Sequence, residues 1–284
     1  MQTLTSPSLI RIIRQLASYK YSKTAHILVA FPALASCDLP VIEDLPGFIR
    51  EPTLRCLRIV RNKILVHHVA RAFKRLSDED NAIARLVALS ISFRKYRVSI
   101  APLQVPSEII RFLQMTKELK PLTVLEIGTA RGGTLFLFTR VAMPEARLVT
   151  VDLPGGPFGG GYPDWMSVLL RSFARDKQRI DLVRGDSHSD RTNRLVRELV
   201  GSIPVDVLFI DGDHTYEGVR RDFETYSGLV RKGGLVAFHD IVPGPAELGV
   251  GVPKFWNEIK SRYEHTEIIA HADQGAYGIG VLQL

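Results

Sequence analysis

The chain has 284 residues, of which 45% are hydrophobic and 24% are charged, so it can form a large core and is not composed like a disordered protein. This length allows one catalytic domain with a smaller addition, but it excludes three ordinary domains. Cys37 and Cys56 are the only cysteines, which excludes a disulfide framework and favours a reducing compartment.

The net charge of +7 belongs to the N-terminal part of the chain. Residues 1–115 carry 17 Lys and Arg against 8 Asp and Glu, whereas residues 116–284 carry 20 against 22. Apolar residues recur at helical spacing from Leu54 to Leu76, with basic residues between them, which predicts a basic amphipathic helix. We therefore expect residues 1–115 to form a mostly helical basic region. It packs on its own domain or contacts a membrane surface or a protein partner.

The first residues resemble a targeting segment in composition, because no acidic residue precedes Asp38. The apolar stretch Ile27–Ala35 is short, contains Pro32 and begins far from Met1 for a signal peptide. No run approaches the roughly 20 apolar residues of a membrane span. We therefore expect a cytoplasmic protein.

Two further helices precede a change of pattern near Leu122. Ser77 is the expected N-cap of one, and the sequence Pro106-Ser-Glu opens the other. Short apolar strands then alternate with helical stretches; they are Thr123–Ile127, Arg147–Val151, Ile180–Val183, Val205–Ile210 and Gly234–His239. This order predicts an α/β fold with a Rossmann-like, doubly wound sheet of parallel strands. The apolar runs Glu267–His271 and Tyr277–Leu282 predict an antiparallel hairpin at its end.

Polar residues stand at the ends of the first three strands. Glycines at 128, 132 and 133, in the sequence EIGTARGG, let the backbone approach a ligand at the start of a helix. Asp152, 24 residues after Gly128, stands where a carboxylate can bind both hydroxyls of a ribose. Asp186 and Ser187 follow the third strand. A single acid at a strand end is usually a turn or cap residue. Acids at three successive strand ends, Glu126, Asp152 and Asp186, favour a nucleotide-like ligand.

A second polar cluster follows the fourth and fifth strands. The sequence VLFIDGDHTYE ends a buried run with Asp211 and His214, and the fifth strand ends with His239 and Asp240. Histidine can act as a general base near neutral pH. For His214, a second interpretation is equally open: a residue in an Asx-like turn, with the next helix capped by Asp213 or Thr215. For His239, its place at a strand end favours function.

These motifs resemble those of class I S-adenosylmethionine-dependent methyltransferases. The similarity extends from about Gln104 to the C-terminus and rests on VLEIGTARGG, LVTVDLP, LVRGDSHS, LFIDGDHTYEGVRRDF and GGLVAFHDIV. It implies that residues 116–284 form an S-adenosylmethionine-binding domain. In such a domain Glu126, Gly128 and Gly132 hold the methionine part of the cofactor, Asp152 binds the ribose, and Asp186 with Ser187 meets the adenine.

The chain is most similar to small-molecule O-methyltransferases of secondary metabolism and saccharide modification, and to the cephalosporin hydroxylase-like group. Many relatives hold a divalent cation at the ends of the fourth and fifth strands, and the matching positions are Asp211, His239 and Asp240. Relatives have an acid or an amide where this chain has His239, and an imidazole suits Mn²⁺ or Zn²⁺ better than Mg²⁺. Either the cation or a histidine acting as general base, His214 or His239, would activate the hydroxyl of the methyl acceptor beside Asp211.

The resemblance implies in-line methyl transfer to a hydroxyl of a sugar or of a glycosylated or polyketide-like metabolite, and we expect a homo-oligomer. The run from Leu153 to Trp165, rich in Gly and Pro, is interpreted as a lid or acceptor loop in which Phe158, Tyr162 and Trp165 are available for contact. No Asn/Asp-Pro-Pro-Tyr motif follows the fourth strand, so we expect no nucleic-acid partner.

Two alternatives come from other functional classes. An NAD-dependent oxidoreductase is disfavoured because the G-x-G-x-x-G fingerprint is absent and a hairpin ends the predicted sheet. A non-catalytic, membrane-associated scaffold would use the basic N-terminal helix and keep the cofactor fold only for binding.

Overall fold

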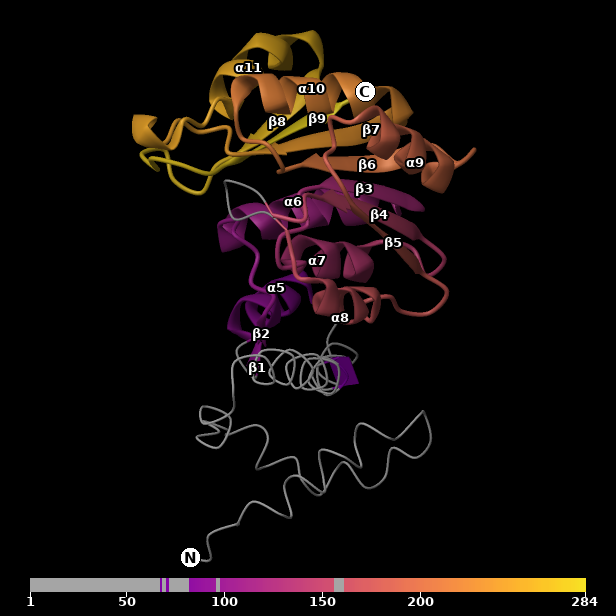
Figure 1. The fold of residues 1–284 in the computed structure, drawn as a ribbon. Helices are drawn as coiled ribbons and strands as arrows, with labels where there is room; N and C mark the ends of the chain where they lie inside the picture. Colours follow the sequence, from indigo (N-terminus) through magenta and orange to yellow (C-terminus); the bar gives the residue numbers. More distant parts are fainter. Residues whose placement is uncertain (1–66, 68–69, 72–81, 96–97, 156–160) are drawn as a thin grey trace, which may run out of the picture. The chain divides into compact units, whose positions relative to one another are not determined.

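A computed structural model describes residue 67 and residues 70–71, 82–95, 98–155 and 161–284 (Figure 1). The contacts divide the chain into Met1–Arg61 and Asn62–Leu284, and the described residues all belong to the second unit. Of the predicted basic helix, only His67, Ala70 and Arg71 are described, and they are helical. Ser77 and Phe158 lie outside the described residues. The assignment of residues 1–115 as a separate basic region therefore stays a prediction.

A seven-stranded sheet forms the centre of this unit, with the strand order β5-β4-β3-β6-β7-β9-β8. Strands β3 to β7 are parallel to one another, and β9 is antiparallel to both β7 and β8. The bounds are β3 (Thr123–Ile127), β4 (Arg147–Asp152), β5 (Arg179–Arg184), β6 (Val205–Ile210), β7 (Val230–His239), β8 (Glu264–Ile268) and β9 (Ile279–Gln283). The predicted parallel sheet with a terminal antiparallel pair is thus confirmed.

Helices cover both faces of the sheet (Figure 1). One face carries α6 (Pro106–Glu118), α7 (Gly133–Val141) and α8 (Ser167–Arg171), and α5 (Ile83–Ser92) packs on α6 and α7. The other face carries α9 (Asp190–Val200), α10 (Tyr216–Tyr226) and α11 (Val252–Ile259). A short hairpin, β1 (Arg94–Lys95) and β2 (Val98–Ser99), follows α5. Single 3₁₀ turns occur at Asp164–Met166, Ser227–Leu229, Ala246–Leu248 and Lys260–Arg262.

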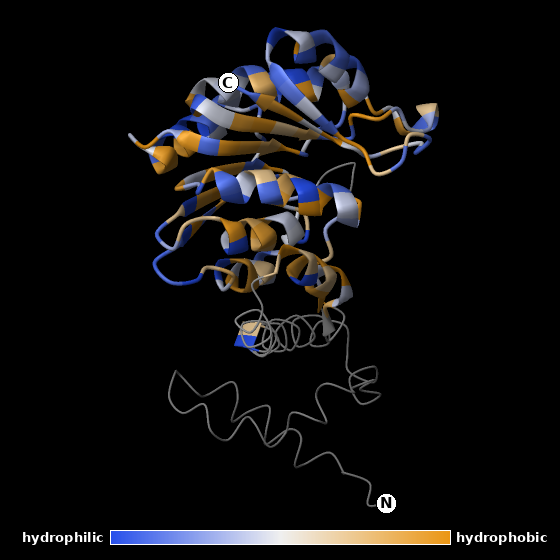
Figure 2. Ribbon diagram, turned by 180° about the vertical axis from the view of Figure 1, so that it is seen from behind, coloured by the Kyte–Doolittle hydropathy of each residue, from blue (hydrophilic) through white to orange (hydrophobic). Residues whose placement is uncertain are grey.

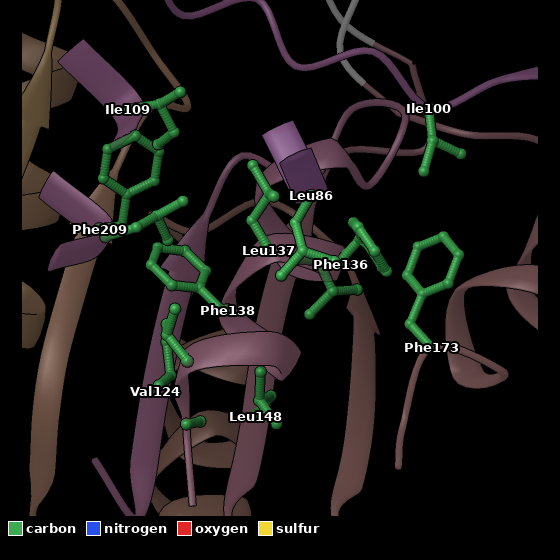
Figure 3. Packing of buried hydrophobic residues seen from close by; sticks show 14 of the residues in the cluster. Leu86, Ile100, Ile109, Val124, Phe136, Leu137, Phe138, Leu148, Phe173 and Phe209 are labelled. Atoms are coloured by element: carbon green, nitrogen blue, oxygen red, sulfur yellow. The ribbon is translucent and has the colours of Figure 1, made fainter. Parts of the chain in front are cut away.

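Alternate residues of each strand enter opposite cores, as the two-residue period of a strand requires. Val124 packs with the α6–α7 face, whereas the next residue, Leu125, packs with the α9–α11 face. The first core also includes Leu86, whose side chain lies beside Leu137 and Phe136 (Figure 3). Residues before position 116 therefore share a core with the sheet. Hydrophobic residues follow the central strands and hydrophilic ones the outer helix faces (Figure 2).

The predicted bounds of the terminal hairpin are wrong by several residues. Strand β8 runs over Glu264–Ile268 and not over Glu267–His271, because most of this edge strand is exposed and its polar residues hide it in the sequence. Strand β9 begins at Ile279, two residues later than predicted, since Tyr277 and Gly278 have φ angles of +68° and +81°. No helix among the described residues has both the length and the apolar character needed to cross a membrane.

Candidate functional site

The site lies where the strand order changes direction, between β3 and β6. The N–H of Asp211 donates to the carbonyl of Ile127 at 2.8 Å, so the two strands leave the sheet side by side. Gly128 has a φ of +100°, and a Cβ there would lie 2.0 Å from the carbonyl oxygen of Asp211. Only glycine fits this position, and it brings the loop after β3 directly against Asp211. Open α/β sheets bind their ligands at such a crevice.

Glu126 lies beneath the glycine loop and is 1% exposed. Its Oε1 accepts a hydrogen bond from Thr134 at 2.5 Å, and its Oε2 accepts one from Thr150 at 2.7 Å. Burial raises the pKa of Glu126 to about 8, despite these two hydrogen bonds, which lower it. Glu126 is therefore mostly protonated at neutral pH, and its visible role is to join β3, β4 and α7 under the loop.

Asp152 ends β4 beside the same loop. Its Oδ2 accepts a hydrogen bond from the N–H of Ala130 at 2.6 Å, and Ala130 has a φ of +44°. Burial raises the pKa of Asp152, while backbone hydrogen bonds, that from Ala130 foremost, oppose that change. Gly132, with a φ of +79°, precedes the first residue of α7. The carboxylate that we predicted to bind ribose is thus fixed against the predicted glycine loop.

Asp186 and Ser187 lie in the loop after β5, at the next strand end. The side chain of Asp186 is 57% exposed, and its Oδ1 accepts the N–H of His188 at 2.9 Å. The carbonyl of Ser187 accepts the hydroxyl of Tyr226 from α10 at 2.7 Å. The structure therefore aligns Glu126, Asp152 and Asp186 at the ends of three adjacent strands.

Asp211, His214, His239 and Asp240 come together at the ends of β6 and β7. His239 Nδ1 lies 3.1 Å from Asp211 Oδ1 and 3.4 Å from Asp240 Oδ1. His214 Nδ1 lies 2.7 Å from Asp240 Oδ2, and its Nε2 lies 3.9 Å from Asp211 Oδ1. Asp240 has a φ of +62°, which is unusual for a residue with a Cβ and sets its carboxylate between the two imidazoles.

The charged groups of this cluster shift one another's pKa values. Burial alone would lower the pKa of His239, but the charge of Asp211 and hydrogen bonds to Asp211 and Asp240 raise it to about 10. Burial would raise the pKa of Asp240, yet its hydrogen bonds with the two histidines hold that pKa well below its usual range. Burial lowers the pKa of His214, but the hydrogen bond to Asp240 and the charges of Asp211 and Asp240 together outweigh it, so the pKa is raised. The two carboxylates therefore favour the protonated form of His239, while His214 is the more accessible imidazole.

The set of residues able to hold a metal differs in part from the predicted one. Among the described residues, Asp211, His214 and Asp240 bring ligand atoms within 4.8 Å of one another. His239, which we predicted as a ligand, instead uses Nδ1 for the two carboxylates, and its buried Nε2 has no hydrogen-bond partner among the described residues. Two carboxylates and one imidazole fit Mn²⁺ or Zn²⁺ better than Mg²⁺.

The segment after β6 forms the turn and the helix cap that the second interpretation of His214 expects. Thr215 is the N-cap of α10 and accepts the N–H of Gly218 at 3.0 Å, while Asp213 accepts the N–H of Thr215 at 2.9 Å. The turn and the cap are therefore present, but neither uses the side chain of His214. That side chain turns to Asp240 instead.

Sequence reasoning missed Gln104 and Glu108, which approach the site from the start of α6. Gln104 Nε2 donates to Asp211 Oδ2 at 2.7 Å, although the two residues are 107 positions apart. No local pattern could have revealed this contact. Tyr162, expected to face an acceptor, is buried at 2% exposure, where burial raises its pKa to about 12.

Residues 125–241 match a family model described as "Methyltransferase domain". These residues form a methyltransferase domain. The match begins in β3 and ends just after Asp240, so it includes both the glycine loop and the acidic cluster. It spans less than half of the chain, and the N-terminal region lies outside it.

Three proteins illustrate what the methyltransferase domain is similar to. An uncharacterized protein, R132, of Acanthamoeba polyphaga mimivirus is 28% identical over 142 residues, or 46% of this chain and 57% of that relative. The O-methyltransferase TomG of Streptomyces achromogenes, solved with S-adenosylmethionine, has 19% identity and a TM-score of 0.48 over 72% of this chain and 90% of its own. An O-methyltransferase of Bacillus cereus, solved with S-adenosylhomocysteine, has 18% identity and a TM-score of 0.48 over 77% and 100%.

Proposed function

We propose that this chain is an S-adenosylmethionine-dependent O-methyltransferase that acts on a hydroxyl group of a small molecule. The observation that carries the proposal is the cluster of Asp211, His214 and Asp240, which lies beside the glycine loop inside a methyltransferase domain. A cofactor on that loop would present its methyl group close to residues able to take a proton from a hydroxyl.

The residues around the loop fit such a cofactor. Asp152 is held by the N–H of Ala130 and is predicted to accept the hydroxyls of a ribose. The backbone amides of the glycine loop, ahead of α7, are proposed to meet the carboxylate of the cofactor's methionine part. Asp186 and Ser187, further along the strand ends, are predicted to meet the adenine. When bound, S-adenosylmethionine supplies a methyl group on a positively charged sulfur.

His214 then has the geometry of a general base. Its Nδ1 is 2.7 Å from Asp240, so in the neutral imidazole the proton stays on Nδ1 and the basic electron pair is on Nε2. The acceptor oxygen forms a bond to the methyl carbon while the carbon–sulfur bond breaks in line, and the hydroxyl proton passes to Nε2. Protonated His214 is stabilised by Asp240 and Asp211.

The same residues fit a divalent cation. Asp211 and Asp240 would each offer an oxygen, and His214 would offer Nε2 in place of its role as base. A cation at this position would lower the pKa of the acceptor hydroxyl. His239 would remain a buried partner of both carboxylates, as its contacts indicate.

The test measures release of S-adenosylhomocysteine with a panel of hydroxylated acceptors: monosaccharides, glycosylated compounds and polyketide-like phenols. Each is assayed after chelation and again with added Mn²⁺. We expect turnover with a member of this panel, and we expect His214→Gln to lower kcat by about 100-fold or more. His271→Gln, a substitution of an exposed histidine, is the matched control and leaves the rate unchanged. Full activity of the His214→Gln variant, both chelated and with Mn²⁺, would refute the assigned role of His214.

A further inference from the structure

The carboxylate of Asp211 is held from two sides. His239 Nδ1 lies 3.1 Å from Oδ1, and Gln104 Nε2 donates to Oδ2 at the shorter distance of 2.7 Å. Gln104 is only 5% exposed, so little water competes for this hydrogen bond. One of the two contacts that orient Asp211 therefore comes from outside the strands that form the site.

The amide of Gln104 suits this position chemically. Only its NH₂ group can face the carboxylate, because a reversed amide would place two acceptor oxygens against each other. An amide is neutral, so it fixes the direction of the carboxylate without cancelling its charge, as Lys or Arg would. Gln104 thus orients Asp211 without placing a further positive charge beside it.

The segment that carries Gln104 is itself fixed at both ends. At one end lies Ile100, which is fully buried in the core of the α6–α7 face. A Cβ on Gly133 would lie 2.4 Å from the carbonyl oxygen of Ile100, so the segment crosses directly over the start of α7. Gln104 therefore has a fixed distance from the glycine loop.

At the other end, Glu108 is fully buried one turn into α6 and binds the connection between β8 and β9. Its oxygens accept hydrogen bonds from the N–H of Ala270 at 3.1 Å, Gln274 Nε2 at 2.7 Å and the N–H of Gly278 at 3.1 Å. This connection carries Tyr277, whose ring centre lies 5.9 Å from that of His239. The segment Ile100–Glu108 thus carries Gln104, and it also holds the connection that packs against His239, the other partner of Asp211.

We infer that Gln104 is a positioning residue for Asp211: its hydrogen bond keeps the carboxylate directed toward His214 and Asp240. This inference rests on the proposed function, because it assigns Gln104 to the group that activates the acceptor. The orienting partners of metal-binding carboxylates typically contribute about 10- to 100-fold to metal affinity.

Calorimetric titration with Mn²⁺ alone tests the inference. Gln104→Met removes the amide and keeps a side chain of similar length, and Gln114→Met makes the same change on the exposed face of α6. We expect Gln104→Met to weaken Mn²⁺ binding by about 10-fold or more. Its affinity for S-adenosylhomocysteine should change by less than about twofold, because the glycine loop is intact, and Gln114→Met should alter neither affinity.

A second readout needs no metal. ¹⁵N-labelled histidine gives imidazole resonances that report on the contact between His239 and Asp211, and a His239→Gln variant assigns them. In metal-free protein at constant pH we expect Gln104→Met to shift the His239 signals and Gln114→Met to leave them in place. Failure of the unmodified protein to bind Mn²⁺ would contradict the metal role in the proposed function, while the histidine spectrum would still decide the role of Gln104. Unchanged His239 signals in Gln104→Met would overturn the inference.

Discussion

His188 and Asp222 form an ion pair that joins the loop after β5 to helix α10, with 3.2 Å between His188 Nε2 and Asp222 Oδ1. Asp222 is fully buried, and the side chain of His188 is 16% exposed. Asp186, 3.8 Å from His188 Nδ1, and the carbonyl of Gly218, 3.2 Å from Nε2, also face the imidazole. The pair therefore anchors the loop on which Asp186 and Ser187 are presented.

We expect His188→Gln to lower the free energy of unfolding by about 3 kcal/mol at pH 6, because it leaves a buried carboxylate without a cationic partner. The contact with Asp222 raises the pKa of His188 in the folded protein. Its stabilisation is therefore complete below the pKa of the unfolded state and is lost as pH rises through the folded-state pKa. Urea denaturation at pH 6 and pH 9 measures the difference. Equal losses at the two pH values would show that the pair is not ionic.

The raised pKa of Glu126 predicts that the free energy of unfolding changes with pH in the opposite direction to that expected for a carboxylate in an ion pair. Its pKa is about 8 in the folded protein against 4.5 for an ordinary glutamate. Between these pH values the folded state keeps a proton that the unfolded state has released, so the free energy of unfolding falls as pH rises. We expect Glu126→Gln to remove up to about 1.4 kcal/mol per pH unit of this slope. Denaturation between pH 5 and 8 measures it.

The control for that experiment is Glu118→Gln, which changes an exposed residue near the end of α6 in the same way. This substitution should leave the slope of the free energy of unfolding against pH as it is in the unmodified protein. A slope unchanged by Glu126→Gln would mean that the buried carboxyl is ionised throughout this range.

Gly128→Ala should destabilise the fold by more than about 3 kcal/mol, because it adds strain at a positive φ to a clash with the backbone of Asp211. Gly155→Ala is the matched control, since a Cβ there meets no atom of the described residues within 4 Å. Thermal unfolding of the two variants, with S-adenosylhomocysteine binding of any folded fraction, measures the difference. Wild-type stability of Gly128→Ala would contradict the close approach of the two strands.

The sequence predicts well whatever depends on local apolar pattern. Strands β3 and β6 are fully buried, so their apolar runs gave the correct bounds, and Asp211 follows from its place at a strand end. Edge strand β8 is mostly exposed, and its position depends on pairing with β9. The contact between His214 and Asp240 could not be predicted, because it depends on the left-handed backbone of Asp240. The contacts of Gln104 and Glu108 join residues more than 100 positions apart.

Calorimetric titration of the purified chain with S-adenosylmethionine, and separately with NAD, tests the central claim most directly. We expect saturable binding of S-adenosylmethionine and of S-adenosylhomocysteine, and affinity at least about tenfold weaker in Asp152→Asn, which exchanges the carboxylate for an amide. We expect no binding of NAD, because the dinucleotide fingerprint is absent. Binding of NAD without binding of S-adenosylmethionine would contradict the account and favour an oxidoreductase.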